Sequence, residues 1–379
     1  MPAKNEGKGR FRLGTLRSLD WFLLAVPAAF VINLVATGKH ETLLFFTAGV
    51  AIVPLAAWLS RATEHLSQRA GPGVGGLLNA TLGNAPELIL SLVALSKGLT
   101  VIVKASITGS IIGNLLLMLG SAMLAGGTRF PHLKFNQTGT RTAATSLGLA
   151  TIGLLIPTIF RLATERQPGG WPSLAAQNLS VTVALVLFAT YLLWIVFSLI
   201  THKNLFVGES HGHHGPGGAN EPVWPVPKAV AILTISAILI AVMSEFVAGS
   251  VEAVCKSLGL TQVFAGVIMV AMVGNASESP AVLVALKNQM DLSLSITIGA
   301  SLQIALFITP VLVFASYLFG LPMTLEFSIP EVAAVALAVG IVTLISGDGE
   351  CNWFEGAQLL GVYLIIALFF FFLPEPVRE

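Results

Sequence analysis

The chain has 379 residues, of which 55% are hydrophobic and only 10% are charged. Soluble domains typically carry about 25% charged residues, so this composition indicates a membrane protein. The formal net charge is +1 and no cluster of Lys and Arg is interleaved with aromatic residues, which argues against a nucleic-acid partner.

Hydrophobic runs of about 20 residues, the length of a helix that crosses a bilayer, recur along the whole chain. They predict an all-α polytopic protein of the lipid bilayer with about eleven transmembrane helices. The expected spans are residues 20–38, 42–62, 73–97, 101–126, 141–163, 178–201, 229–254, 261–287, 291–318, 327–346 and 355–373. A basic arm, residues 1–19, precedes the first span. A signal peptide also starts with basic residues, but this apolar run is long and has no clear cleavage site, so we expect a retained helix.

The distribution of Lys and Arg among the expected loops predicts the orientation, because these residues concentrate on the cytoplasmic side. The loops on the side of the N-terminus hold nearly twice as many of them as the opposite loops. We therefore expect a cytoplasmic N-terminus and, with eleven spans, a C-terminus outside. The short basic arm and the modest length fit a prokaryotic inner (plasma) membrane.

Two nearly identical phrases interrupt the apolar runs. Residues 83–87 read Gly-Asn-Ala-Pro-Glu, and residues 274–278, which lie 191 positions later, read Gly-Asn-Ala-Ser-Glu. With the first helix set aside, residues 42–201 and 229–373 form two repeats of five spans, joined by a linker at 202–228 that is rich in His, Gly and Pro. Because five is odd, the second repeat enters the membrane from the opposite face. This inverted topology is typical of secondary transporters.

Glu87 and Glu278, which end the two phrases, are the main candidates for an ion-binding site. A carboxylate inside a membrane is costly unless it is paired or bound to a ligand. Each glutamate shares a helical face with the asparagine three residues earlier, which is Asn84 in one phrase and Asn275 in the other. Two such faces that meet would form a cage of oxygens with two negative charges.

The remaining residues of the phrases fit the same chemistry. Gly83 and Gly274 permit a bend, and freed backbone carbonyls become oxygen ligands. Hard divalent cations such as calcium bind six to eight oxygens in flexible geometry. Neither phrase contains Cys or His, which argues against a softer metal. For the Gly-Asn-Ala residues alone, close packing between helices is an equally good interpretation.

Other polar residues are weaker candidates. Three of them would complete the ion shell or line its approach, with hydrogen bonds between helices as the alternative: Ser110, Ser301 and Gln303. Four acidic residues would gather cations at a pathway mouth, with solvated, capping or anchoring roles as the alternative: Glu64, Glu245, Glu252 and Asp348. The two cysteines, Cys255 and Cys351, match no metal or redox spacing and are expected to be packing residues.

Several segments together resemble the calcium/proton exchanger (CAX) family of the cation/calcium antiporter superfamily. They are residues 77–88, which read Leu-Leu-Asn-Ala-Thr-Leu-Gly-Asn-Ala-Pro-Glu-Leu, then residues 244–252, 274–278, 301–307 with Pro310, and 347–356. The resemblance implies eleven helices, an inverted two-fold core and antiport of cytosolic calcium against inward-moving protons. No cofactor is expected beyond these transported ions, and the oligomeric state is left open.

The chain departs from the family pattern at three places. Pro86 takes the variable position of the first signature. Ser279 stands where the second signature usually has a histidine, which bears on ion selectivity and pH dependence. The linker, often acidic in the family, instead contains four histidines: His202, His211, His213 and His214. These would bind a transition metal or sense pH, or the stretch is simply a flexible connection.

A mechanism follows from electrostatics. Two carboxylates about 5 Å apart repel each other by roughly 3 kcal/mol at an effective dielectric constant of about 20, which favours proton uptake by a site without a cation. A bound divalent cation reverses this balance, so calcium and protons compete. The alternatives are an antiporter of the same fold with sodium/calcium, manganese or potassium coupling, and a membrane-embedded enzyme. The sequence offers no His-Glu-x-x-His phrase and no pair of intramembrane aspartates for such an enzyme.

Overall fold

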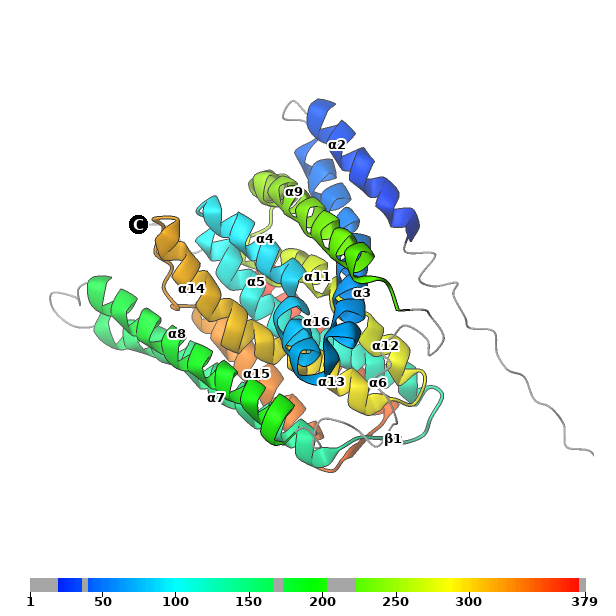
Figure 1. Cartoon of the computed structure of the whole chain (residues 1–379). Coiled ribbons are helices and arrows are strands. Elements are labelled where there is room, and N and C mark those ends of the chain that lie inside the picture. The colour runs from blue at the N-terminus through cyan, green and yellow to red at the C-terminus, as the bar shows by residue number, and fades with distance from the viewer. Residues whose placement is uncertain (1–19, 36–39, 166–172, 203–222, 375–379) are drawn as a thin grey trace, which may run out of the picture.

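The computed structural model describes residues 20–35, 40–165, 173–202 and 223–374. The expected basic arm and three of the linker histidines, His211, His213 and His214, lie outside the described residues. The described chain is almost entirely helical (Figure 1), as its hydropathy predicts.

The elements follow one another along the chain, with η marking short 3₁₀ or π-helical turns. They are η1 (Trp21–Leu24), α2 (Ala25–Val35), α3 (Glu41–Leu82), α4 (Ala85–Ser96), α5 (Thr100–Ile112), η2 (Gly113–Met118), α6 (Leu119–Gly127), β1 (Leu133–Lys134), α7 (Gln137–Glu165), α8 (Ser173–Val196), η3 (Phe197–Thr201), α9 (Val226–Leu258), α10 (Gln262–Phe264), η5 (Ala265–Val270), α11 (Ala271–Gly274), η6 (Asn275–Glu278), α12 (Pro280–Ala285), α13 (Met290–Gln303), η7 (Ile304–Ile308), α14 (Thr309–Leu318), α15 (Ile329–Ile345), β2 (Glu350–Cys351) and α16 (Trp353–Phe372). The two short strands pair antiparallel and tie the loop before α7 to the loop before α16.

The lengths of the apolar helices make this a polytopic membrane protein. Within the described residues, seven helical segments are long and apolar enough to cross a bilayer, and a bent pair, Val74–Leu82 with Ala85–Ser96, makes an eighth. Three shorter apolar helices, Trp21–Val35, Gln262–Glu278 and Ile329–Ile345, fall below 18 residues. Each of the eleven expected spans overlaps one of these segments. The count of eleven crossings stays a prediction.

The second expected span, residues 42–62, ends before its helix does. The backbone of α3 stays helical to Gly71, where φ is 81° and the helix kinks before resuming to Leu82. A φ in this left-handed region suits glycine, which has no Cβ. The charged residues after position 60 made the hydropathy fall, but a helix that leaves the bilayer keeps its backbone hydrogen bonds and need not end there.

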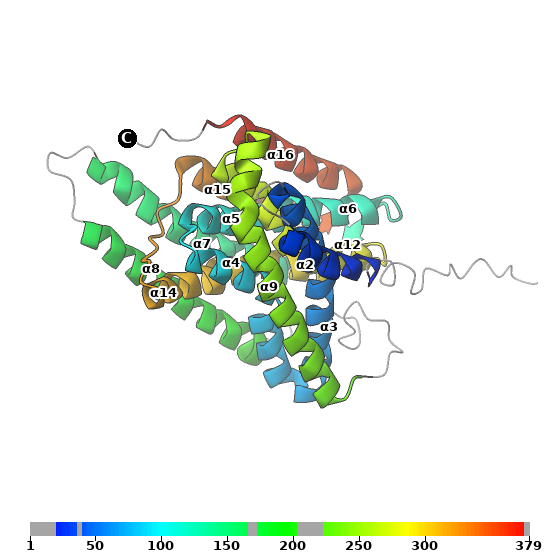
Figure 2. The same ribbon diagram turned by 90° about the horizontal axis from the view of Figure 1, so that it is seen from above.

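The helices pack into two apolar clusters on either side of α4. One cluster is built from α2, α3 and α9, and α3 packs along α9 more extensively than any other two elements (Figures 1 and 2). The other cluster is built from α5 to α8 and α13 to α16. From α4, Leu90 is buried in the first cluster and Leu95 in the second. The helix α4, which carries Glu87, therefore lies between the two apolar clusters.

Candidate functional site

The first phrase breaks a helix. After α3 ends at Leu82, Asn84 has a non-helical backbone (φ −106°, ψ 32°) and precedes α4, whose first turn contains Pro86 and Glu87. Proline fits this position because its missing N–H has no partner in a first helical turn. The Asn84 Nδ2 atom donates a hydrogen bond of 3.0 Å to the carbonyl oxygen of Ala300 in α13. The break thus places the Glu87 carboxylate at the start of a helix. The Asn84 hydrogen bond ties the same break to α13.

The second phrase breaks a helix in a different way. Asn275–Glu278 form the single 3₁₀ turn η6 between α11 and α12, and Pro280 opens α12. The Asn275 Nδ2 atom donates a hydrogen bond of 3.1 Å to the carbonyl oxygen of Ser110 in α5. Each asparagine therefore bonds to the backbone of a helix from the other half of the chain.

The two glutamates meet through a serine hydroxyl. The Ser277 Oγ atom lies 3.1 Å from Glu87 Oε1 and 3.0 Å from Glu278 Oε1, so these two carboxylate oxygens are no farther apart than the sum of these distances. Only 5% of Glu87 and 3% of Glu278 is exposed, which removes both charges from water. A hydroxyl has one proton and donates to one oxygen at a time. A proton or a cation between the carboxylates is needed to make both contacts favourable.

Three buried oxygens at this site accept no hydrogen bond from the described part of the chain. They are the second carboxylate oxygens of Glu87 and Glu278 and the amide oxygen of Asn275. A buried acceptor without a partner costs roughly 1–3 kcal/mol. Oxygens from carboxylates and amides are the ligands that calcium takes. The described residues contain no cluster of three or more His, Cys, Asp or Glu side chains that would hold a metal ion, so the candidate site is one of two carboxylates supported by amides.

The glycines of the phrases give the site its close packing. A Cβ atom on Gly274 would lie 3.1 Å from the Cγ atom of Glu87 and 3.8 Å from Ser110 Oγ. A Cβ atom on Gly83 would lie 3.4 Å from Gln303 Oε1. The structure therefore brings Ser110 and Gln303 to the broken helices. Ser301 is fully buried but its hydroxyl donates to the Thr297 carbonyl of its own helix at 3.0 Å, which matches the alternative of a helical hydrogen bond.

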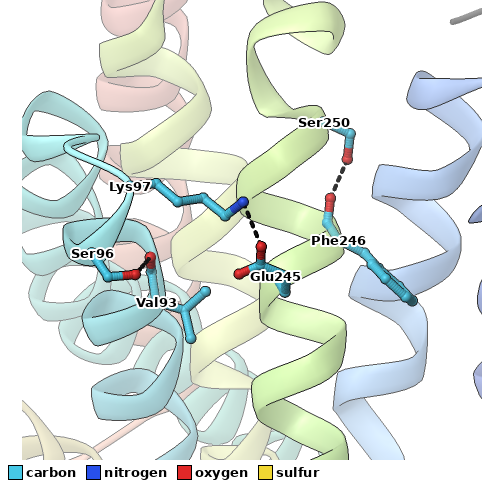
Figure 3. Close-up of polar contacts among 6 residues, drawn as sticks. All are labelled: Val93, Ser96, Lys97, Glu245, Phe246 and Ser250. Atoms are coloured by element: carbon cyan, nitrogen blue, oxygen red, sulfur yellow. Dashed lines mark hydrogen bonds and ion pairs between the residues drawn. The ribbon is translucent and has the colours of Figure 1, made fainter.

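The acidic residues expected at a pathway mouth lie apart from the carboxylate pair. Glu245 on α9 forms an ion pair of 2.6 Å with Lys97, at the end of α4 opposite Glu87 (Figure 3). Lys97 follows Glu87 by ten residues, which corresponds to about 15 Å along a helix, so the ion pair lies well away from the carboxylate pair. The Glu64 carboxylate accepts a hydrogen bond from Gln68 at 3.3 Å.

The remaining two are exposed: Glu252 lies near the C-terminal end of α9, and Asp348 lies in the loop before β2. Their role in collecting cations stays a prediction.

Sequence reasoning missed three polar residues inside the helical bundle, of which Ser277 is half-buried and the other two are buried. Ser277 was part of the phrase but was not singled out as the group that links the carboxylates. Asn114 is fully buried in η2, one turn after Ser110, and its amide has no hydrogen-bond partner among the described residues. A lone amide inside an apolar run was the available signal. Glu331 is buried in a capping box with Ser328, a pairing that the Ser-x-x-Glu spacing could have revealed.

The fold and the site define a polytopic α-helical membrane protein whose helices break at a buried pair of carboxylates. The chain belongs to the sodium/calcium exchanger protein family, whose model matches residues 40–200 and 228–372. This confirms the family relationship predicted from the signature segments.

The chain is similar over nearly its whole length to named antiporters. It is 46% identical to a Ca(2+)/H(+) antiporter of Aphanothece halophytica, with 93% of this chain and 95% of the relative covered. It is 39% identical to the Ca(2+)/H(+) antiporter ChaA of Bacillus subtilis, with 93% and 99% covered.

Solved structures agree with the fold. The structure of native YfkE matches with a TM-score of 0.77 at 36% identity, covering 93% of this chain and all of that one. An H+/Ca2+ exchanger CAX matches with a TM-score of 0.66 at 16% identity, with 94% and 93% covered, which shows the fold alone.

Proposed function

We propose that this protein is a secondary active antiporter that exchanges calcium for protons across a membrane, and that Glu87 and Glu278 bind the two ions in competition. The observation that carries the proposal is the pair of buried carboxylates around the Ser277 hydroxyl, each with one oxygen that accepts no hydrogen bond from the described residues. The names of the similar antiporters from Aphanothece halophytica and Bacillus subtilis support the same pair of ions.

The competition has a simple physical origin. Two carboxylates held this close repel each other by a few kcal/mol, and burial adds to the cost of keeping both charged. Protons remove this cost when they bind. A calcium ion between the carboxylates removes it as well, with Asn275 Oδ1 as a further ligand. Since both ions relieve the same repulsion, binding of one expels the other, and exchange follows when the site opens to each side of the membrane in turn.

The proposal includes two inverted repeats, residues 42–201 and 229–373, behind a first helix. Two features support it. The π-helical turns η2 and η7 begin at Gly113 and Ile304, which are separated by the same 191 residues as the two phrases. The hydrogen bonds from Asn84 to α13 and from Asn275 to α5 are reciprocal between the halves. Ion sites between such halves near the bilayer midplane are typical of transporters with inverted repeats.

We also propose that the protein lies in a prokaryotic plasma membrane with a cytoplasmic N-terminus and the C-terminus outside. The bacterial relatives and the distribution of Lys and Arg support this assignment. We further propose that the protein acts as a transporter rather than an enzyme, as its named relatives do, and that calcium and protons are its cargo.

Transport into proteoliposomes tests the proposal. An outward-directed proton gradient should drive calcium uptake by the wild-type protein, whereas a sodium gradient of the same size should not. Glu87→Gln and Glu278→Gln should each abolish this uptake, because a neutral amide neither binds calcium strongly nor exchanges protons. Glu41→Gln, at the start of α3, is the matched control and should transport normally. Near-normal transport by both site variants would refute the assignment of the ion site to these glutamates. Uptake driven by a sodium gradient alone would show that sodium, and not the proton, is the coupling ion.

A further inference from the structure

Cationic and aromatic side chains converge where the first part of α3 ends and α9 begins. The rings of Trp58 on α3 and Trp224 just before α9 lie 6.0 Å apart, centroid to centroid. The guanidinium carbon of Arg61 lies 5.7 Å from the Trp58 centroid, and the Lys228 Nζ atom lies 4.6 Å from the Trp224 centroid. Arg69 completes the group, which we call the α3–α9 basic patch. Its guanidinium donates to the carbonyl oxygens of residues 224 and 223 at 2.6 and 3.1 Å.

Two acidic side chains lie near the basic patch, and each of them accepts a hydrogen bond from an uncharged N–H group. The Asp20 carboxylate accepts a hydrogen bond from the Trp58 indole at 3.1 Å, and Glu64 accepts one from the Gln68 amide. Within the part of the chain that the structure describes, neither Arg61 nor Lys228 forms an ion pair with a carboxylate. Their N–H groups are donors that another molecule can use.

The location of the basic patch decides what that molecule is. The apolar segment Glu41–Gly71 of α3 ends beside it, and the apolar helix Val226–Leu258 starts there, so it lies at one edge of the hydrocarbon layer. Tryptophan, lysine and arginine are favoured at this depth, where lipid headgroups surround them. Lys228 is exposed and Arg61 is half-buried, so neither side chain is closed off by the described residues.

We propose that the α3–α9 basic patch binds the phosphate headgroup of an anionic phospholipid. The guanidinium of Arg61 and the ammonium of Lys228 would donate to the phosphate, and the two indole rings would pack against the glycerol and upper acyl chain. The patch lies where two apolar helices end, at the depth of lipid headgroups, so its location favours a lipid phosphate over a free phosphate ion. Such a lipid would bridge α3 and α9, the two helices that pack most extensively together.

Native mass spectrometry of the full chain tests this site. The protein is released from nanodiscs that contain phosphatidylglycerol and phosphatidylcholine in equal amounts, and retained lipids are counted. We expect wild-type protein to retain phosphatidylglycerol preferentially. Each cation near a lipid surface contributes about 1 kcal/mol, so Arg61→Gln with Lys228→Gln should weaken this retention about thirtyfold. The charge-conserving variant, Arg61→Lys with Lys228→Arg, should retain the lipid. This result would show that the loss in the glutamine variant comes from the charge and not from the substitution itself.

The control removes two other exposed cations, Lys256→Gln and Lys287→Gln, and should leave lipid retention unchanged. Equal retention of both lipids by wild-type protein, or unchanged retention after loss of Arg61 and Lys228, would overturn the proposal. Displacement of the lipid by millimolar inorganic phosphate would show an anion site that does not recognise lipid. Because the readout is lipid retention, the result is independent of which ions the protein transports.

Discussion

The packing of Gly274 against Glu87 makes a sharp prediction about the ion site. A Cβ atom at position 274 would lie 3.1 Å from Glu87 Cγ, closer than ordinary van der Waals contact, and 3.8 Å from Ser110 Oγ. Gly274→Ala therefore has to move the Glu87 side chain by a few tenths of an ångström. Glu87 carries one of the two proposed charges, so this displacement changes the distance between the carboxylates and the ligand cage they form.

The size of the effect follows from packing energetics. Adding a methyl group to a filled interior typically costs about 1–3 kcal/mol. If this cost falls on the calcium-bound site, in which Glu87 is held most tightly, the affinity for calcium drops about fivefold to 150-fold. The variant should still fold, because alanine is favoured over glycine in helices by up to about 1 kcal/mol, which offsets part of the strain.

The assay is the calcium dependence of proton-driven uptake in proteoliposomes, with thermal unfolding in detergent as the measure of folding. Gly299→Ala is the matched control, since a Cβ atom there meets nothing within 4 Å although the residue adjoins Ala300, the partner of Asn84. We expect a higher calcium concentration for half-maximal uptake in Gly274→Ala and no change in Gly299→Ala. Identical calcium dependence in both variants would refute the idea that Gly274 fixes the position of Glu87.

Three further predictions concern individual side chains or pairs of them. Ser277→Ala removes the hydroxyl between the carboxylates and should weaken calcium affinity about fivefold, the value of one hydrogen bond of ~1 kcal/mol, and unchanged affinity would show that the hydroxyl is dispensable. Burial raises the pKa of the Cys351 thiol to about 12, so in a Cys255→Ala background its alkylation should be slow at neutral pH and accelerate about tenfold per pH unit, whereas a fast, pH-independent rate would contradict this. The Lys97–Glu245 ion pair has side chains that are 31% and 53% exposed, so a double-mutant cycle read by thermal unfolding should give a coupling energy of at most about 1 kcal/mol, and a much larger value would show a desolvated pair.

The hydropathy of the chain was sufficient to locate the helices and the two phrases at which they break. These features are local, because a run of about 20 apolar residues or a Gly-Asn step can be recognised without knowledge of the fold. The end of the second span was missed because Arg61 and Glu64 lower the hydropathy while the helix continues to Gly71.

The details of the site depend on tertiary structure. That Ser277 lies between two glutamates from different halves of the chain is a consequence of how the halves pack, and no local pattern encodes it. The same holds for the bond of Asn84 to Ala300 and for the contact of Gly274 with Glu87. The sequence predicts residues such as Asn84 and Glu87 one by one, whereas the distances among them depend on how the two halves pack.

The central claim is that calcium and protons compete for Glu87 and Glu278, and proton release on calcium binding tests it most directly. Calcium is added to the purified protein in a weakly buffered detergent solution while a pH indicator and a calcium electrode are read together. The account predicts that the wild-type protein acidifies the solution as it binds calcium, and that the variant with both Glu87→Gln and Glu278→Gln neither binds calcium nor releases protons. Calcium binding by the wild-type protein without any proton release would contradict it.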